Sequence, residues 1–462
     1  MSLRQGLTLV LICGLLSTFG FGCKGLSTTE KQAIAPVTLE YWTVTDDVDA
    51  INKLVAQYTA QRQHLKVNVR QLGPNEIYTR LVEELADDRG PDIISVNNRE
   101  LNLYTSKLAP MPVSVQDTTY QVVKGNFSDQ TLVNIATVNL PTLTQLDSEY
   151  VSAVKKDAVS GGRIYGLPLS LDTFALYYNK DLLDRAGIPE PPKNWEEFQD
   201  AVRKTTRFDA NRENILQSGA ALGTGNNIPG FDDLLFVLFR QSGVDFTASN
   251  GQAVFNRAAR TESGATVAHN VVDFYTDYSN PARDTYSWNE KMDNALDKFA
   301  RGSLAFFFGY SYHRPQITAR APQLNYGVLP LLQLNPDRPI NAANYYLQTV
   351  VKKSKHQQEA WALINYLAHS TATRGYLEQS RRPTAMRAYI PMQQTDLELS
   401  PFVSQVLIAE NWYRGRNYAG ARKALLDLCT DWLAPTQARE EQIIKARTDA
   451  LNRAAAKVNQ TL

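Results

Sequence analysis

The sequence predicts an α/β fold made of more than one compact unit. The chain has 462 residues, and at about 150 residues per domain this indicates roughly three domains or two large ones. Between residues 37 and 96, short apolar segments alternate with amphipathic ones in the order strand, helix, strand, helix, strand. This succession is typical of a parallel sheet covered by helices.

The first α/β layer is predicted from five consecutive segments. Residues 37–42 alternate like a strand, and so do residues 65–69. Residues 48–58 and 77–85 carry apolar side chains at helical spacing. Residues 92–96 form a short apolar run, which indicates a buried parallel strand.

The rest of the chain continues to mix strands and helices. Residues 110–160 are polar and irregular and predict no clear element. Asn194 can cap a helix, with Glu197 at the reciprocal capping position. Further elements are predicted over residues 162–183, 293–300, 302–309, 359–367 and 422–458.

Composition excludes several classes of protein. Lys and Arg total 48, Asp and Glu total 47, and the net charge of +1 argues against a nucleic-acid-binding protein. Only five His and three Cys are present, so we expect no metal site and no cofactor. The phosphate-binding glycine loop, the zinc-protease, C-x-x-C and serine-hydrolase motifs do not occur, so we expect no catalytic residues.

The N-terminus reads as an export signal. Residues 7–21 form an apolar run that is short for a membrane-spanning helix. Gly22-Cys23 closes the run and resembles the cleavage box of bacterial lipoproteins, with Gly20 as a departure from the pattern. We therefore expect a signal peptide over residues 1–22, lipid on Cys23, a polar tether over 23–36 and an extracytoplasmic, membrane-anchored protein. The alternative is an ordinary secretory signal with an incidental cysteine.

Motifs along residues 37–462 occur in the order and spacing of one known family. Residues 162–168 read GRIYGLP, residues 177–183 read YYNKDLL and residues 191–198 read PPKNWEEF. Further matching segments are residues 90–94, 186–188, 302–309, 326–330, 350–354 and 359–361. Together they resemble the extracellular solute-binding protein family 1 of ATP-binding cassette (ABC) importers, which contains maltose- and other sugar-binding proteins.

This resemblance implies a periplasmic-binding-protein-like fold with two α/β lobes around a ligand cleft. It implies three hinge crossovers, placed near Tyr177, Val328 and Arg382, and a hinge motion that closes the lobes on a ligand. The predicted N-terminal lobe comprises residues 37–177 and 328–382, and the C-terminal lobe 178–327 and 383–462. The implied function is capture of a mono- or oligosaccharide and its delivery to the permease subunits of an importer, without catalysis.

Candidate ligand-binding residues follow the predicted strands, because ligands of open α/β sheets bind beyond the carboxyl ends of strands. Carbohydrates are held by carboxylates and amides at hydroxyls and by flat rings at the apolar face. The resemblance places Asp172 at an acidic sugar-binding position, with a structural cap as the alternative. It places Thr43, Asp46 and Asp47 in a sugar-contacting loop, where Asp46 or Asp47 could instead cap a helix. The candidates are Thr43, Asp46, Asp47, Asn97, Asn98, Asp172, Tyr310, Tyr312, Tyr345, Trp412 and Tyr418.

Two alternatives to a sugar receptor stay open. Arg99 and Glu100 depart from the order in which relatives carry an acidic ligand in this loop, which argues against a maltose-like specificity. Arg381, Arg382, Arg414 and Arg416 would suit an anionic solute such as a phosphate ester, or a peptide. The other alternative is an exported hydrolase that acts on carbohydrates.

Overall fold

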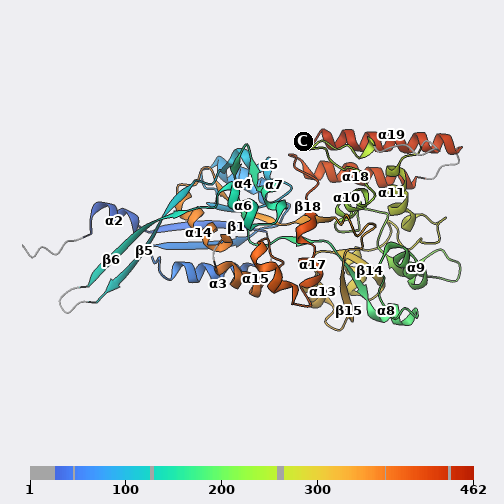
Figure 1. The fold of residues 1–462 in the computed structure, drawn as a ribbon, viewed down its shortest axis with the longest axis horizontal. Helices are drawn as coiled ribbons and strands as arrows, with labels where there is room; N and C mark the ends of the chain where they lie inside the picture. The colour runs from blue at the N-terminus through green and yellow to red at the C-terminus, as the bar shows by residue number, and fades with distance from the viewer. Residues whose placement is uncertain (1–25, 45–46, 125–128, 258–264, 370, 435–438) are drawn as a thin grey trace, which may run out of the picture.

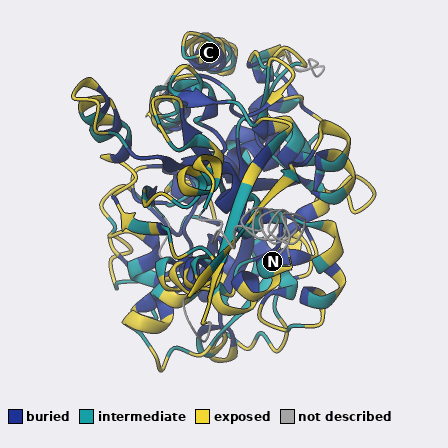
Figure 2. Cartoon of the chain, turned by 90° about the vertical axis from the view of Figure 1, so that its left-hand side faces the viewer, coloured by how far each residue is buried: buried dark blue, intermediate teal, exposed yellow. Residues whose placement is uncertain are grey.

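Two separate sheets divide the protein into two α/β lobes (Figure 1). The computed structural model describes residues 26–44, 47–124, 129–257, 265–369, 371–434 and 439–462. Each lobe has its own apolar core, and in Figure 2 the buried strands lie beneath helices whose outer faces are exposed. The predicted α/β class and two-lobe architecture are therefore confirmed.

The first lobe is built on a sheet with the order β2-β1-β3-β17-β4. Its parallel strands are β1 (Val37–Thr43), β2 (Leu65–Gln71) and β3 (Ile93–Asn97), as the sequence pattern predicts. The strand β17 (Tyr346–Val351) pairs antiparallel with β3, and β4 (Leu108–Ala109) and β9 (Leu167–Pro168) pair antiparallel with β17. Because β1 and β3 end beside one another, the loops that follow them meet at one edge of the sheet.

Helices cover the first sheet. The helix α3 (Val48–Thr59) buries Ile51, Leu54, Val55 and Tyr58 on one face, the spacing that predicted it. The other helices of this lobe are α4 (Ile77–Ala86), α5 (Leu101–Tyr104), α6 (Leu143–Glu149), α7 (Ser152–Ala158), α14 (Gln357–His369), α15 (Ala372–Ser380) and α16 (Ile390–Gln394). A short pair, β7 (Val159–Ser160) and β8 (Arg163–Ile164), completes it.

The region of residues 110–160, which gave no clear pattern, contains a long hairpin. Its strands β5 (Ser114–Val123) and β6 (Gln130–Asn139) extend away from the body beside α2 (Thr28–Ala33) (Figure 1). Most of the hairpin is exposed, so its sequence lacks the apolar alternation of a half-buried strand. The predicted tether therefore includes a short helix, while Cys23 and the predicted signal peptide lie outside the described residues.

The second lobe is built on a sheet with the order β12-β13-β14-β11-β15. These strands are β11 (Ala175–Asn179), β12 (Arg207–Phe208), β13 (Ile215–Ala220), β14 (Leu304–Gly309) and β15 (Tyr326–Pro330). The helices are α8 (Lys180–Arg185), α9 (Trp195–Thr205), α10 (Phe231–Gln241), α11 (Val267–Thr276), α12 (Ala295–Ala300), α13 (His313–Arg320), α18 (Tyr418–Leu433) and α19 (Glu440–Asn459). Within the described part of the chain, no helix combines the length and apolar character needed to cross a membrane.

Three short strands connect the lobes in one small hinge sheet. They are β10 (Asp172–Thr173), β16 (Asn341–Asn344) and β18 (Ala409–Glu410), with α17 (Ser400–Val403) beside them. Asp172 pairs with Asn344 across β10 and β16. The chain therefore crosses between the lobes at these three strands, each of which lies where residues of one core give way to residues of the other.

These crossings lie elsewhere than the positions predicted near Tyr177, Val328 and Arg382. Tyr177 and Val328 are strand partners inside the second sheet, on β11 and β15. The family motifs that contain them mark strands of the second lobe, so they misplace the crossings. Accordingly, the first core takes its residues from 39–171 and 343–409, and the second core mostly from 174–342 and 412–458.

Candidate functional site

A cavity of about 410 Å³ lies between the lobes beside the hinge. It lies beyond the carboxyl ends of β1 and β14, which is where open α/β sheets bind ligands. Its lining comprises Val44, Asp47, Gln71, Pro74, Leu169, Ser170, Asp172, Tyr312, Gln316, Asn344, Tyr345, Tyr346, Gln348, Tyr376 and Arg382. A wider groove of about 730 Å³ shares Asp47, Tyr312 and Arg382 with it and runs between α13 and the end of α15. The cavity is therefore polar, ringed by tyrosines and open toward α13 and α15.

Asp172 places a buried carboxylate in the cavity wall. Its side chain accepts hydrogen bonds from the Ser311 hydroxyl at 2.5 Å, the Ser311 amide at 3.1 Å and the Thr173 amide at 2.9 Å. Burial raises the pKa of Asp172 to about 6, and the bonds from Ser311 oppose the rise. At neutral pH the carboxylate is ionised, although it is close to its midpoint in mildly acidic solution.

Tyr312 provides a ring at the junction of the cavity and the groove. It is stacked on Tyr310 with ring centroids 5.5 Å apart, and the guanidinium of Arg382 lies 5.8 Å from its centroid. Tyr346 also lines the cavity and is partly exposed. A flat ring beside a carboxylate and a guanidinium suits a ligand with both an apolar face and polar groups.

Asp47 lies at the first-lobe side of the cavity. It precedes α3, but its side chain makes no capping hydrogen bond to that helix. Instead, the Tyr376 hydroxyl donates to the Asp47 carboxylate. The helix-capping interpretation of Asp47 is therefore wrong. The neighbouring candidate, Asp46, lies outside the described residues.

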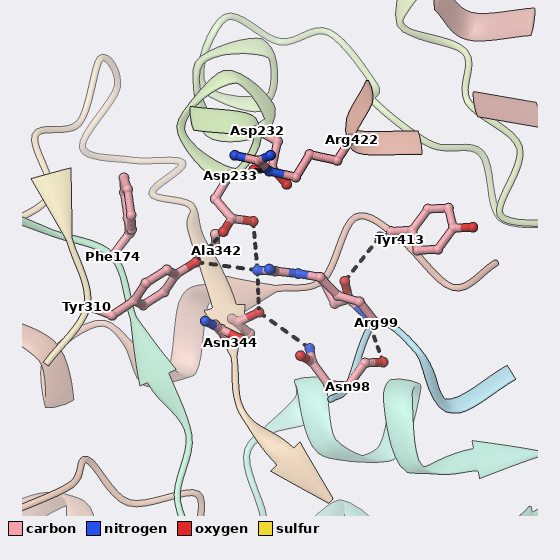
Figure 3. Close-up of polar contacts among 12 residues, drawn as sticks. Asn98, Arg99, Phe174, Asp232, Asp233, Tyr310, Ala342, Asn344, Tyr413 and Arg422 are labelled. Carbon is pink, nitrogen blue, oxygen red and sulfur yellow. Dashed lines mark hydrogen bonds and ion pairs between the residues drawn. The ribbon is translucent and has the colours of Figure 1, made fainter. Parts of the chain in front are cut away.

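Behind Tyr310, a buried ion pair joins the two lobes (Figure 3). Arg99, from the loop after β3, donates from Nη2 to the Asp233 carboxylate on α10 at 2.7 Å and from Nη1 to the Tyr418 hydroxyl at 3.1 Å. Tyr310 donates to the other Asp233 oxygen at 2.6 Å. Tyr418 donates to Asp232 at 2.5 Å. The two ionic partners are 6% and 2% exposed, so this network is shielded from solvent.

The charges of this network balance each other. Burial raises the pKa of Asp233, and the positive charge of Arg99 opposes that rise. Asp232 and Asp233 lie in the first turn of α10, where the helix dipole favours negative charge. Arg422 adds a second cation, 3.4 Å from the Asp232 carboxylate. A buried arginine is therefore matched by acids placed at a helix start.

A second buried cluster surrounds Asp157 at the same side of the hinge. Its carboxylate accepts hydrogen bonds from Asn98 at 3.0 Å, Tyr345 at 2.9 Å, Asn411 at 3.2 Å and Arg414 at 2.9 Å. Asp157 belongs to the first lobe, whereas Arg414 follows the last hinge strand. This cluster and the Arg99 network together connect the lobes behind the cavity.

The structure brings four of the predicted site residues to the cavity lining: Asp47, Asp172, Tyr312 and Tyr345. Six others among the described residues lie outside that lining. Thr43 and Trp412 are buried in the protein interior, Asn97 donates to Asn344, Asn98 contacts Asp157, and Tyr310 and Tyr418 belong to the Arg99 network. Burial of a ring depends on the lobe arrangement, which the local sequence does not encode.

Several residues of the site were not among the sequence candidates. Tyr346, Tyr376, Gln71 and Gln348 line the cavity, as does Arg382, which the sequence offered only for an anionic solute. The pair Asp232-Asp233 was also missed, although two acids at the start of an otherwise apolar helix are a visible signal. Among the described residues, no group of three or more His, Cys, Asp or Glu side chains could hold a metal ion.

Comparison with known proteins identifies the family. The model of the family described as bacterial extracellular solute-binding protein matches residues 41–373. The multiple sugar-binding protein of Streptococcus mutans is 20% identical over 381 residues, which is 81% of each chain. A binding protein of Brucella abortus is 23% identical over 256 residues, and the matched part spans 58% of its length and 53% of this chain.

Solved structures share the fold. A cyclo/maltodextrin-binding protein complexed with maltotetraose superposes with a TM-score of 0.67 at 16% identity, covering 92% of this chain and 97% of the other. An ABC transporter solute-binding protein of Thermotoga lettingae, bound with α-D-tagatose, gives a TM-score of 0.67 at 17% identity, with coverage of 92% and 99%. With the family match over most of the two-lobe body, these findings establish that the chain belongs to the bacterial extracellular solute-binding protein family.

Proposed function

We propose that this protein is an extracytoplasmic receptor that binds a carbohydrate between its lobes and delivers it to an ABC importer. The observation that carries the proposal is the cavity beside the hinge, which is lined by both Asp172 and Tyr312. The same class of ligand is supported by the related structures that hold α-D-tagatose and maltotetraose and by the similarity to the multiple sugar-binding protein of Streptococcus mutans. The permease subunits of the importer are the proposed protein partners.

The cavity residues suggest how a sugar is held. The Asp172 carboxylate can accept hydrogen bonds from hydroxyls, and bonds to a charged acceptor are the stronger kind. The amide groups of Gln71 and Asn344 can both donate and accept, whereas that of Gln348 can donate, because its oxygen already accepts from Tyr41 and Ser95. The ring of Tyr312 can pack against the apolar face of a pyranose. Recognition by these groups requires binding only, without a bond-breaking step.

A thermal-shift screen with saccharides, peptides and phosphate esters tests the proposal. A ligand at 100 times its Kd should stabilise the folded protein by about 2.7 kcal/mol. We expect at least one saccharide to raise the melting temperature in this way. Stabilisation by peptides or phosphate esters alone would refute carbohydrate specificity, and release of free sugar from glycosides by the pure protein would favour the hydrolase alternative.

Tyr312→Ala should weaken binding of the saccharide selected by that screen. Loss of ring stacking removes about 0.5–1.5 kcal/mol beyond the buried area, so the Kd should rise several-fold. Calorimetric titration measures the change. Tyr286→Ala is the matched control, because Tyr286 lies outside the cavity lining and stacks on Phe208. Equal affinities for the Tyr312 variant and the wild type would remove this ring from the site.

Closure of the lobes on the ligand stays a prediction of the hinge. The three hinge strands are short, and a few residues in such segments can absorb a rotation of the lobes. Small-angle scattering should give a smaller radius of gyration with saturating saccharide than without it. An unchanged radius would show that the cavity binds without closure.

Anchoring through Cys23 is proposed from the sequence alone. Cleavage before this residue and lipid on its sulfur would attach the receptor to the membrane beside the importer. Cys23→Ala should leave the protein uncleaved or release it from the membrane fraction, as seen by fractionation and mass spectrometry. A mature N-terminus at any other residue would contradict the lipoprotein assignment.

A further inference from the structure

We propose that Arg99 closes one end of the ligand cavity, so that the receptor recognises a terminal ring of its saccharide. This inference rests on the proposed carbohydrate function and makes Arg99 a specificity-determining residue rather than a ligand contact. The rest of the saccharide would leave the cavity only on the side of α13 and α15.

The guanidinium of Arg99 spans the space between the lobes. In Figure 3 it points from the loop after β3 toward Asp233 on α10 and the hydroxyl of Tyr310. Its Nη2 also donates to the carbonyl oxygen of Ala343 in the hinge strand β16 at 3.3 Å. The Cζ atom of the guanidinium lies 5.2 Å from the centroid of the Tyr418 ring. The side chain thus contacts the first lobe, the hinge and the second lobe.

This network adjoins the cavity wall directly. Tyr312 lines the cavity and stacks on Tyr310, which belongs to the network. Asn344 also lines the cavity and accepts a hydrogen bond from Asn97, two residues before Arg99. Tyr312 and Asn344 therefore lie between the cavity and the Arg99 network, and Arg99, Asp233 and Tyr310 do not line the cavity.

The open and closed sides of the cavity lie on opposite sides of the molecule. The groove that continues the cavity is lined by residues of α13 and the end of α15, on the lower side in Figure 1. Arg99 contacts α10 and the start of α18, which lie on the upper side. A saccharide chain therefore has an exit toward α13 and α15 and a wall of buried side chains toward α10 and α18.

The groups behind this wall would otherwise suit further sugar rings. Tyr310 and Tyr418 are aromatic, and Asp232 and Asp233 are carboxylates, the two kinds of side chain that bind carbohydrates. In this chain their hydroxyl and carboxylate groups are engaged with Arg99, with each other and with Arg422. Arg99 thus converts a potential binding surface into a closed end.

Two derivatives of the saccharide that best stabilises the wild type test the proposal. One carries a 4-nitrophenyl group at its reducing end, and the other a benzylidene acetal on its non-reducing ring. The wild type should bind one derivative about as tightly as the parent and the other about 100-fold more weakly, because a clash at the closed end rejects it. Calorimetric titration gives the three Kd values.

The double variant Arg99→Met/Asp233→Asn removes both charges of the pair and should open the closed end. It should recover at least about tenfold affinity for the rejected derivative. Arg62→Met/Asp117→Asn is the matched control, because that ion pair lies at the base of the hairpin, away from the cavity. The control should discriminate between the derivatives as the wild type does.

Three results would overturn the inference. The wild type could bind both derivatives as tightly as the parent saccharide, or it could bind both much more weakly than the parent. The third such result is a folded double variant that discriminates between the derivatives as strongly as the wild type does. The first two need no variant, so a double variant that fails to fold leaves the proposal testable. Absence of binding by any saccharide would instead refute the proposed function, and this inference with it.

Discussion

Arg99→Ala is expected to lower the free energy of unfolding by about 3–5 kcal/mol. The substitution leaves the Asp233 carboxylate buried, with Tyr310 still donating to it but without its cation. Removing one partner of a buried pair costs more than removing both, because the remaining charge stays desolvated. The loss also removes one of the two polar networks that connect the lobes beside the hinge, so unfolding should become less cooperative.

Urea unfolding followed by far-ultraviolet circular dichroism measures this effect. Arg99→Met/Asp233→Asn should lose much less stability than Arg99→Ala, although it changes one more residue. Arg453→Ala is the surface control, because its ion pair with Asp431 is half exposed on both sides and should contribute no more than about 1 kcal/mol. An equal decrease in the free energy of unfolding for Arg99→Ala and Arg453→Ala would show that the interlobe pair stabilises the protein no more than a surface pair does.

Asp172→Ala is expected to weaken saccharide binding by roughly ten- to a hundredfold. Hydrogen bonds to a charged group contribute about 1.5–3 kcal/mol, and every 1.4 kcal/mol is about a factor of ten in Kd. Asp172→Asn should weaken saccharide binding less than Asp172→Ala, because the amide oxygen still accepts a hydrogen bond. Titration of both variants with the same saccharide checks the order, and unchanged affinity in Asp172→Ala would exclude this carboxylate from the site.

The same residue should make the free protein less stable at neutral pH than in mild acid. Burial raises its pKa from 3.8 to about 6 in the folded state. The folded protein therefore holds this proton more tightly than the unfolded chain, so its contribution to stability falls as pH rises from about 4 to about 6. The total change for one group is about 3 kcal/mol at 1.36 kcal/mol per pKa unit.

Melting of the ligand-free Asp172→Asn variant isolates this contribution. Relative to the wild type, the variant should be more stable at pH 8 than at pH 4.5, because it lacks the buried charge. Saccharide affinity of the wild type should also decline as the pH falls through about 6, since the protonated carboxyl is a weaker acceptor. A variant that loses stability equally at both pH values would indicate a structural role for the carboxylate instead.

Local patterns predicted the fold where one side of each element is buried. The strands β1 and β2 and the helices α3 and α4 follow from apolar spacing alone, and β3, which is buried on both faces, follows from a continuous apolar run. The β5–β6 hairpin was missed because most of it is exposed and shows no such spacing. The three crossings were misplaced because they lie in short strands that have no apolar pattern of their own.

The candidate site was predicted less completely because it depends on contacts between distant segments. Arg99 and Asp233 are 134 positions apart, and nothing near either residue reveals the other. Tyr310 and Trp412 follow strands and Tyr418 begins a helix at the correct edge, yet the rings of Tyr310 and Trp412 are buried, Tyr418 is half-buried, and none of the three lines the cavity. Position along a strand identifies the edge of the sheet, but the packing of the two lobes decides which rings face a ligand.

A crystal structure of the protein with the saccharide that raises its melting temperature most tests the central claim directly. We expect the sugar between the lobes, with one ring packed on Tyr312 and a hydroxyl donating to Asp172. A second groove, of about 720 Å³, lies at the far end of the first lobe between α2, the hairpin and α14. A sugar bound there, or at any site that leaves Tyr312 and Asp172 without contact, would contradict the account.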